Sequence, residues 1–191
     1  MTIDSASQGR LYYIVGPSGA GKDTLLRLAR ESIGGSLGLV FAHRYITRPH
    51  QDASENHVAL TEAEFDLRAH KGCFAMQWAS HGYRYAVGIE IHDWLSRGIC
   101  VMVSGSREYL PHALQIYPDL RLIWVSAPAV LLRERLHTRG REEGDAIAAR
   151  LARAAAYAVP PKHPDLQLDN TGSPEHAAAD LVAYLKKHCA A

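Results

Sequence analysis

The sequence Gly16-Pro-Ser-Gly-Ala-Gly21-Lys22 constrains the fold of this chain more strongly than any other feature. Its G-x-x-x-x-G-K spacing is that of a phosphate-binding loop, in which successive backbone N–H groups surround a phosphate in front of a helix N-terminus. Leu11–Val15, a run of apolar and aromatic residues, predicts a buried strand before the loop. Leucines at helical spacing from Thr24 to about Arg30 predict a helix after it. This order predicts phosphate binding, the alternative being a tight turn with a solvent-exposed lysine.

The loop and the two residues after it are the predicted ATP contacts. They are Gly16, Pro17, Ser18, Gly19, Ala20, Gly21, Lys22, Asp23 and Thr24. Glycines allow positive φ and close approach of the backbone, and Lys22 is placed to neutralise β- and γ-phosphate oxygens. We therefore expect Lys22 to be a catalytic residue.

Asp23 stands where such loops usually have a serine or threonine that contacts Mg²⁺. The apolar run ending at Val103 is followed by Ser104 and Gly105, where many such enzymes have a metal-associated acid. One hypothesis is that Asp23 is a metal ligand, holding Mg²⁺ directly or through water. The alternative is that Asp23 caps the helix and complements its dipole.

Further apolar runs predict the rest of the core. Ile99–Val103 and Leu120–Val125 have the pattern of central parallel strands, each followed by a helical segment. A last strand near Leu166–Leu168 leads to a terminal helix after Ser173-Pro174. The alternation predicts an α/β fold of the P-loop NTPase class, a parallel core sheet flanked by helices with right-handed crossovers.

The segment of about 44–87 breaks this alternation. A strand at His57–Leu60, a capping box at Thr61–Glu64 that begins a helix, and hairpin strands at Phe74–Trp78 and Tyr83–Val87 predict a small inserted subdomain that binds the acceptor. We expect one domain over residues 1–191, with its core in about 10–43 and 88–191.

Arginines gather in the segment of about 135–153, which the sequence predicts to be a lid. The Arg139-Gly-Arg141 turn lies between two helical patterns, so the lid could bring its arginines onto the charge of a transferred phosphoryl group. The alternative is that these arginines pair with Glu134, Glu142 and neighbouring acids on a solvated surface.

Composition excludes several partner classes. The formal net charge is +1, which gives no indication of a nucleic-acid or membrane partner, and no apolar run approaches a membrane span. Three cysteines without C-x-x-C spacing predict reduced thiols in a cytoplasmic protein, and the eleven histidines show no metal-binding spacing. Oligomeric state stays open.

Taken together, these segments resemble the guanylate-kinase-like branch of the nucleoside monophosphate kinases over nearly the whole chain. The matching strings are the Gly16–Lys22 loop, Thr47-Arg48, Arg135–Arg141 and Ile147–Leu151. The resemblance implies phosphoryl transfer from ATP to a phosphate monoester. It also implies Arg48 on the acceptor phosphate, with Arg135, Arg139 and Arg150 as catalytic residues on the transferred group.

The chain departs from guanylate kinases where they bind the base. Gln77 replaces their acidic residue before Trp78-Ala79, and Ser104–Arg107 replaces a second acidic stretch. Carboxylates accept hydrogen bonds from the N1–H and N2–H groups of guanine, so the base-recognition pair is absent.

A closer resemblance covers these departures. Ala42–Arg48, Ser54–His57, Gly88–Glu90 and Ser104–Arg107 look like the ribose 1,5-bisphosphate phosphokinases of phosphonate catabolism, which also have aspartate after the loop lysine. The resemblance implies that ATP, with Mg²⁺, phosphorylates the 1-phosphate of ribose 1,5-bisphosphate to give 5-phosphoribosyl 1-diphosphate (PRPP). The substrate-binding residues predicted with it are Arg44, Arg48, Tyr85, Glu90 and Arg107.

Individual roles stay hypotheses. Arg107, or else Arg44 or Arg84, is the predicted ligand of the second phosphate, and ribose hydroxyls are assigned to Glu55, Asn56, His57 and Glu90. The adenine is assigned to the lid side and the Asp169–Thr171 loop. Two other functions stay open: a nucleoside monophosphate kinase of altered specificity, and a non-catalytic guanylate-kinase-like interaction module, although such modules tend to lose the lysine and arginines found here.

Overall fold

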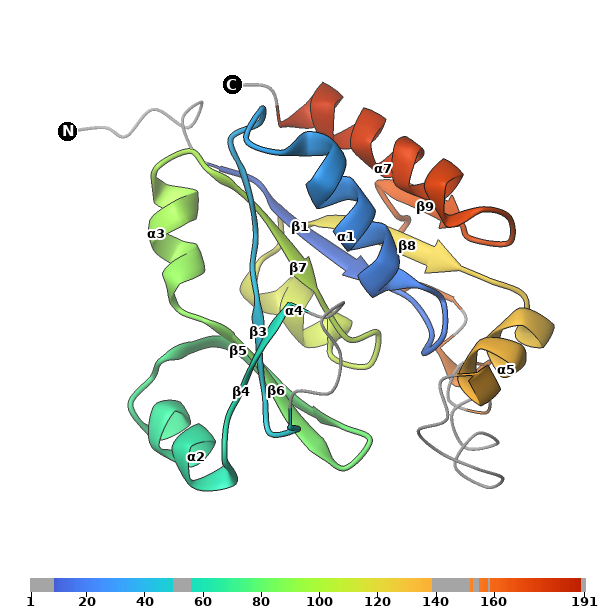
Figure 1. Cartoon of the computed structure of the whole chain (residues 1–191). Coiled ribbons are helices and arrows are strands. Elements are labelled where there is room, and N and C mark those ends of the chain that lie inside the picture. The colour runs from blue at the N-terminus through green and yellow to red at the C-terminus, as the bar shows by residue number, and fades with distance from the viewer. Residues whose placement is uncertain (1–8, 50–55, 139–151, 153–154, 158, 190–191) are drawn as a thin grey trace.

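The core is a five-stranded parallel sheet with the strand order β2-β7-β1-β8-β9 (Figure 1). The computed structural model describes residues 9–49, 56–138, 152, 155–157 and 159–189. The core strands are β1 (Leu11–Val15), β2 (Leu39–Phe41), β7 (Cys100–Ser104), β8 (Arg121–Ser126) and β9 (Leu166–Asp169). The predicted parallel α/β core is therefore confirmed.

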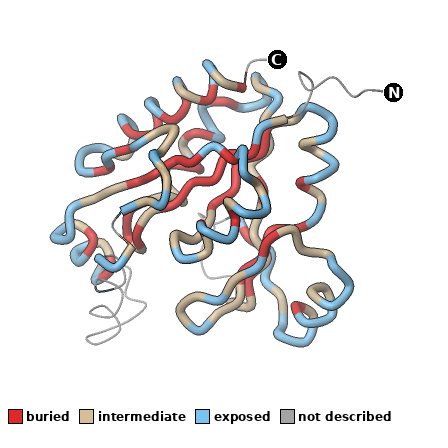
Figure 2. Tube along the Cα trace, turned by 180° about the vertical axis from the view of Figure 1, so that it is seen from behind, coloured by how far each residue is buried: buried red, intermediate tan, exposed pale blue. Residues whose placement is uncertain are grey.

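Helices cover both faces of this sheet. Residues of α1 (Lys22–Ile33) and α7 (Pro174–His188) pack with Tyr12 and Ile14 of β1 on one face. Residues of α3 (Glu90–Ser96) and α4 (Leu110–Ile116) pack with the alternate residues of β1, Tyr13 among them, on the other. A strand buried on both faces must be apolar throughout, which explains the unbroken run of β1. Figure 2 shows the buried trace running through the central strands.

A second, four-stranded sheet with the order β4-β3-β6-β5 lies beside the core. It comprises β3 (Arg44–Ile46), β4 (His57–Ala59), β5 (Phe74–Ser80) and β6 (Tyr83–Gly88), with α2 (Glu62–His70) between β4 and β5. The predicted hairpin is confirmed as β5–β6, and its turn contains positive φ at His81 and Gly82. Thr61 accepts the N–H of Glu64 as a capping box requires, but the Glu64 carboxylate pairs with Arg68.

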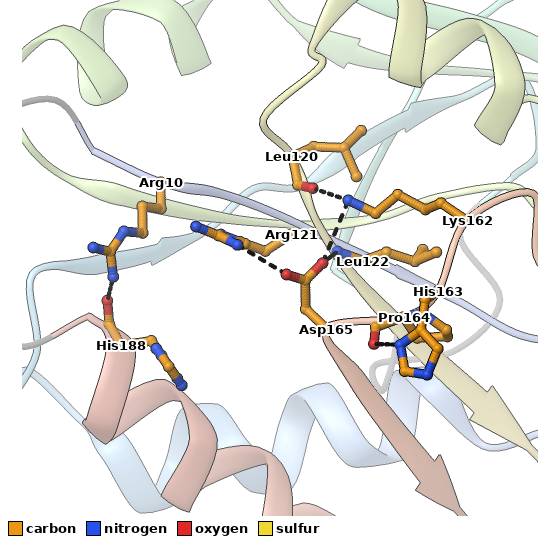
Figure 3. Close-up of polar contacts among 9 residues, drawn as sticks. All are labelled: Arg10, Leu120, Arg121, Leu122, Lys162, His163, Pro164, Asp165 and His188. Carbon is orange, nitrogen blue, oxygen red and sulfur yellow. Dashed lines mark hydrogen bonds and ion pairs between the residues drawn. The ribbon is translucent and has the colours of Figure 1, made fainter.

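Hydrogen bonds and ion pairs of charged side chains join the start of β9 to the start of β8 (Figure 3). Both strands begin at the end of the sheet remote from the glycine loop. The Asp165 carboxylate accepts hydrogen bonds from the Leu122 N–H at 2.8 Å and the Arg121 guanidinium at 3.0 Å, and lies 3.4 Å from Lys162 Nζ. Burial alone would raise the pKa of Asp165, but these partners together lower it below its usual value. Arg10 also donates to the His188 carbonyl, joining the start of β1 to α7.

The states of the cysteines and the lengths of the helices bear on the remaining predictions. Cys100 and Cys189 are buried, Cys73 is half-buried, and all three are free thiols. Among the helices in the described part of the chain, none has the length and apolar character needed to cross a bilayer.

Candidate active site

The glycine loop has the strand–loop–helix setting that its sequence predicted. β1 ends at Val15 and α1 begins at Lys22, with Gly21 as the N-cap residue. Gly19 and Gly21 have φ of 86° and 84°, a region that side chains with a Cβ rarely adopt. A Cβ at Gly16 would lie 2.6 Å from the Val125 carbonyl oxygen, so the loop approaches β8 too closely for a larger residue.

Lys22 folds back over this loop. Its Nζ donates to the carbonyl oxygens of Gly16 at 2.8 Å and Pro17 at 3.2 Å. The ammonium group therefore lies against the same loop whose N–H groups would bind phosphate, where its charge can act on phosphate oxygens.

α5 (Ala129–Thr138) packs directly on the loop. Leu132 and Leu136 both lie within 4 Å of a Cβ built at Gly19. Arg135 Nη2 donates to the Asn170 carbonyl at 3.1 Å, and Arg135 Nη1 is buried with no hydrogen-bond partner in the described part of the chain. The helix thus holds one guanidinium beside the loop with a donor still to be satisfied.

The structure gives Asn170 a different role from the adenine contact that the sequence predicted. The sequence assigns it with its neighbours to the adenine, yet the residue is only 1% exposed and Nδ2 donates to the Ala20 carbonyl at 2.7 Å. A Cβ at Gly21 would lie 2.4 Å from the same nitrogen. Asn170 therefore supports the loop and positions Arg135. Only its place after the last strand, at the carboxyl edge of a parallel sheet, hinted at a role.

Two further predicted catalytic residues, Arg139 and Arg150, lie outside the described residues, as do Arg141 and Glu55. Of the predicted lid, the structure describes residues 135–138, at the end of α5, and residue 152. The roles of these four residues stay predictions.

Asp23 forms an ion pair that neither hypothesis for it included. Its Oδ1 lies 3.2 Å from Arg44 Nη2, and the two side chains are 27% and 11% exposed. Because Gly21 is the N-cap, the idea that Asp23 caps α1 is wrong. Its place in the first turn does complement the helix dipole. The pair links α1 to β3, the phosphate loop to the second sheet.

Arg44 lies over an aromatic stack. Its guanidinium carbon is 5.9 Å from the ring centre of Tyr85, which is 8% exposed. Tyr85 stacks on Trp78 at 5.7 Å and an interplanar angle of 5°, and Trp78 contacts Tyr109 at 5.6 Å. Tyr85, predicted to bind substrate, thus forms a flat wall that holds Arg44.

Arg48 and Arg84, the two other arginines at the second sheet that were predicted to bind phosphate, have different partners. Arg48 follows β3 and lies 5.8 Å from the ring centre of Tyr83. Arg84 pairs with Asp66 and Glu62 and stacks 4.2 Å from the ring centre of Phe65. The structure therefore does not favour Arg84 as a ligand of the second phosphate, and Arg48 stays the predicted ligand of the first.

Glu90, at the start of α3, folds its carboxylate over Gly88. A Cβ at Gly88 would lie 1.9 Å from Glu90 Oε2. Although the side chain as a whole is 31% exposed, Glu90 Oε1 is buried without a hydrogen-bond partner among the described residues, 3.7 Å from His43 Nε2. This oxygen can accept a hydrogen bond from a substrate hydroxyl, as the prediction for Glu90 requires.

Arg107 contacts the backbone of a distant segment of the chain. Its Nη1 donates to the Tyr157 carbonyl at 2.9 Å, and burial lowers the pKa of the guanidinium to about 10. The loop before it is held by Tyr13, whose hydroxyl accepts the Ser106 N–H at 3.0 Å and donates to the Ser106 carbonyl at 3.3 Å. A buried tyrosine in a strand carries no sequence signal for this role.

Comparison with solved structures identifies the fold. The chain superposes on guanylate kinase from Anaplasma phagocytophilum with a TM-score of 0.69, at 17% identity and covering 96% of this chain and 87% of that one. A gluconokinase from Sinorhizobium meliloti gives a TM-score of 0.51 at 17% identity over 96% and 94% of the two chains. These similarities show a guanylate-kinase-like fold.

Comparison with curated proteins identifies the family, although no family model matches the chain. Proteins named ribose 1,5-bisphosphate phosphokinase PhnN are 52% identical over 163 residues in Thiobacillus denitrificans and 51% over 180 residues in Burkholderia mallei. These matches cover 85% and 94% of this chain, and 84% and 97% of the relatives. A protein of the same name from Laribacter hongkongensis is 52% identical over 95% of this chain, which spans 43% of that longer relative. This chain belongs to the ribose 1,5-bisphosphate phosphokinase family.

Proposed function

We propose that this chain transfers the γ-phosphoryl group of ATP to the 1-phosphate of ribose 1,5-bisphosphate, giving ADP and PRPP. The observation that carries the proposal is the paired construction of the site. A phosphate loop with Lys22 and Arg135 against it is joined, through Asp23 and Arg44, to a second sheet without the acidic base-recognition residues.

The chemistry requires charge control and alignment. An oxygen of the acceptor 1-phosphate forms a bond to the γ-phosphorus while the bond from that phosphorus to the β,γ-bridging oxygen breaks, and ADP leaves with the electron pair. Because the attacking oxygen is already ionised, no strong general base is needed. Loop N–H groups, Lys22 and the unsatisfied Nη1 of Arg135 bind the donor phosphates in this scheme, and Arg139 and Arg150 act on the transferred group.

Mg²⁺ fits the donor set on the loop side. The described residues contain no group of three or more histidines, cysteines or acids that could enclose a metal ion. Mg²⁺ commonly keeps several waters and takes only one or two carboxylates together with substrate phosphates, so a single carboxylate suffices. Asp23, next to Lys22, is that carboxylate. When bound, the ion neutralises phosphate charge, and Asp23 holds it in place, directly or through water.

The second sheet holds the acceptor in this proposal. Arg48 binds the 1-phosphate, and the buried Glu90 Oε1 accepts a hydrogen bond from a ribose hydroxyl. Gln77 is exposed on β5 and is neutral, with one acceptor oxygen where the acidic guanine reader has two charged ones. We infer the cytoplasm as the compartment, where ATP is available and three free thiols persist.

Product identification tests the proposal. The purified chain is incubated with MgATP and ribose 1,5-bisphosphate, GMP or AMP, and products are separated by anion exchange and mass. We expect PRPP and ADP in equal amounts, with kcat/KM for GMP lower by about 10² or more, because a site without the base acceptors leaves the guanine donors unpaired. Faster turnover of GMP would favour the altered nucleotide kinase, and failure to bind ATP would favour the interaction module.

A further inference from the structure

A small pocket lies between the flank of α1, the segment from β2 to β3 and the end of β7. Its polar wall consists of Arg27 and Arg30 on α1, Arg44 on β3, Asn56 before β4, and Ser104 at the end of β7. Asp23 also lines it, and Asp23 is the neighbour of Lys22 in the sequence. The pocket therefore adjoins the phosphate loop on the side that faces the second sheet.

The charge of this wall favours an anion. Three arginines line the pocket against one carboxylate, that of Asp23. Arg27 is neutralised by Glu31 at 2.8 Å, and Arg44 is paired with Asp23 at 3.2 Å. Arg30 lies 5.3 Å from the ring centre of Phe41 and forms no ion pair with any residue of the described segments. One guanidinium of the wall, that of Arg30, thus has no counter-charge within the described part of the chain.

A buried hydroxyl in the wall also lacks a partner. Ser104 is 5% exposed, and its Oγ makes no hydrogen bond within the described ranges. A buried polar atom that has left water without gaining a protein partner is destabilising, and such atoms usually meet a ligand or water. Its position at the carboxyl end of β7, in register with Ile14 of β1, puts it at the edge where α/β proteins bind ligands.

We propose that this pocket binds the second phosphate of the acceptor, which on the proposed function is the 5-phosphate of ribose 1,5-bisphosphate. The inference rests on that function. Arg44 supplies a planar guanidinium suited to phosphate oxygens and lies over the Tyr85 ring, Ser104 donates its hydroxyl, and Arg30 supplies a further positive charge in the wall. Asp23, the carboxylate that would oppose an anion here, is already neutralised by Arg44.

This assignment replaces the one that the sequence favoured. Arg107 donates to the Tyr157 carbonyl and does not line the pocket. Arg44 and Ser104 do, and Ser104 stands within the string that replaces the acidic residues of guanylate kinases. The same exchange that removes a base reader therefore supplies a phosphate ligand.

Two acceptor substrates, ribose 1,5-bisphosphate and ribose 1-phosphate, distinguish the subsite for the second phosphate from the rest of the active site. Ribose 1-phosphate retains the attacking phosphate and the sugar but lacks the 5-phosphate. We expect Ser104→Ala and Arg30→Gln to raise KM for ribose 1,5-bisphosphate about 10-fold, and Arg44→Gln about 100-fold, since charge-assisted hydrogen bonds are the stronger ones. The two milder variants should leave the constants for ribose 1-phosphate unchanged. Arg97→Gln, which removes an exposed arginine paired with Asp93, is the matched control.

The outcomes distinguish this inference from the proposed function. If the unaltered chain does not convert ribose 1,5-bisphosphate, the function is wrong. If it does, but the variants lose equally on both acceptors, the subsite is wrong and the function stands.

Calorimetric titration of the ATP-free chain with ribose 5-phosphate gives a readout independent of turnover. Binding should be weakened in Ser104→Ala and Arg44→Gln and retained in Arg97→Gln. Equal affinity in all four proteins would overturn the assignment.

Discussion

The two halves of the proposed site, a donor half and an acceptor half, are built in different ways. The donor half uses backbone groups of one continuous loop, braced by Asn170 and α5. The acceptor half uses side chains from β3, α3 and β7, which come together only in the folded protein. A backbone site depends on a few glycines and one lysine, whereas a side-chain site can change its ligand by exchanging residues such as Gln77 and Ser104. Phosphoryl transfer is thus held constant while the acceptor varies.

From this comparison we expect the largest loss of turnover from a substitution in the donor half. Lys22→Met keeps the length of the side chain and removes its charge, so we expect kcat to fall about 10²–10³-fold, as for other removed transition-state donors. Steady-state assays with saturating MgATP measure it. Lys71→Met, at the exposed end of α2, is the control and should leave kcat unchanged. A fall of less than tenfold for Lys22→Met would break the distinction between the halves.

A second change tests whether the donor half depends on its bracing. In Gly21→Ala the new methyl group would meet Asn170 Nδ2 at 2.4 Å and force φ of 84° on alanine. We expect the free energy of unfolding to fall by about 1–3 kcal/mol and ATP affinity to fall with it, because Asn170 also positions Arg135.

Gly72→Ala is the matched control for this strain. Gly72 also has positive φ, 68°, but a Cβ there would meet nothing within 4 Å. It should lose stability without losing ATP affinity, as urea unfolding and nucleotide titration would show. Equal effects on ATP binding in both variants would mean that the bracing by Asn170 is not needed.

Much of the donor half was predictable because its signal is local. Strand, loop and helix adjoin in the sequence, and each pattern is long enough to recognise. Asn170 and Tyr13 were missed as supports because what a buried polar group contacts depends on tertiary structure, and neither residue type indicates its partner.

The residues of the proposed acceptor half were predicted by resemblance more than by pattern, and their roles stay predictions. β2 and β3 have three residues each, too few to show a period, and α3 begins without a capping side chain. The pairing of Asp23 with Arg44 crosses from helix to strand, so no spacing rule could predict it. Arg107 was favoured because it is a basic residue in an unusual string, and its bond to the Tyr157 carbonyl could not be read from the sequence.

The Asp23–Arg44 pair is where the two halves meet, and its removal should have an intermediate effect. Asp23→Asn keeps the shape and removes the charge. If Asp23 holds Mg²⁺, the Mg²⁺ concentration for half-maximal turnover should rise about tenfold, the usual loss when one charge-assisted contact is removed. A double-mutant cycle combines Asp23→Asn with Arg44→Gln and measures the free energy of unfolding in urea. Because the pair is partly exposed, the coupling energy between the two side chains should be about 1 kcal/mol. Unchanged Mg²⁺ dependence would leave Asp23 with the Arg44 pairing alone.

The smallest expected effect lies outside both halves, at the β8–β9 fastening. The pKa of Asp165 is lowered in the folded chain, so its carboxylate stabilises the fold above the usual aspartate range, and this stabilisation is lost as pH falls through the lowered pKa. Asp165→Asn should cost about 1 kcal/mol at pH 7, and the difference from the unaltered chain should shrink as pH falls through the lowered pKa of Asp165. Asp119→Asn, an exposed change just before β8, should show no such pH-dependent difference.

Because Asp165 lies at the end of the sheet remote from the glycine loop, the KM values of the Asp165→Asn variant for both substrates should stay within about twofold of those of the unaltered chain, as for surface changes worth under 0.5 kcal/mol. A larger shift in the KM for ATP would mean that β9 transmits strain along its length to Asn170, and the donor half would then extend across the whole sheet.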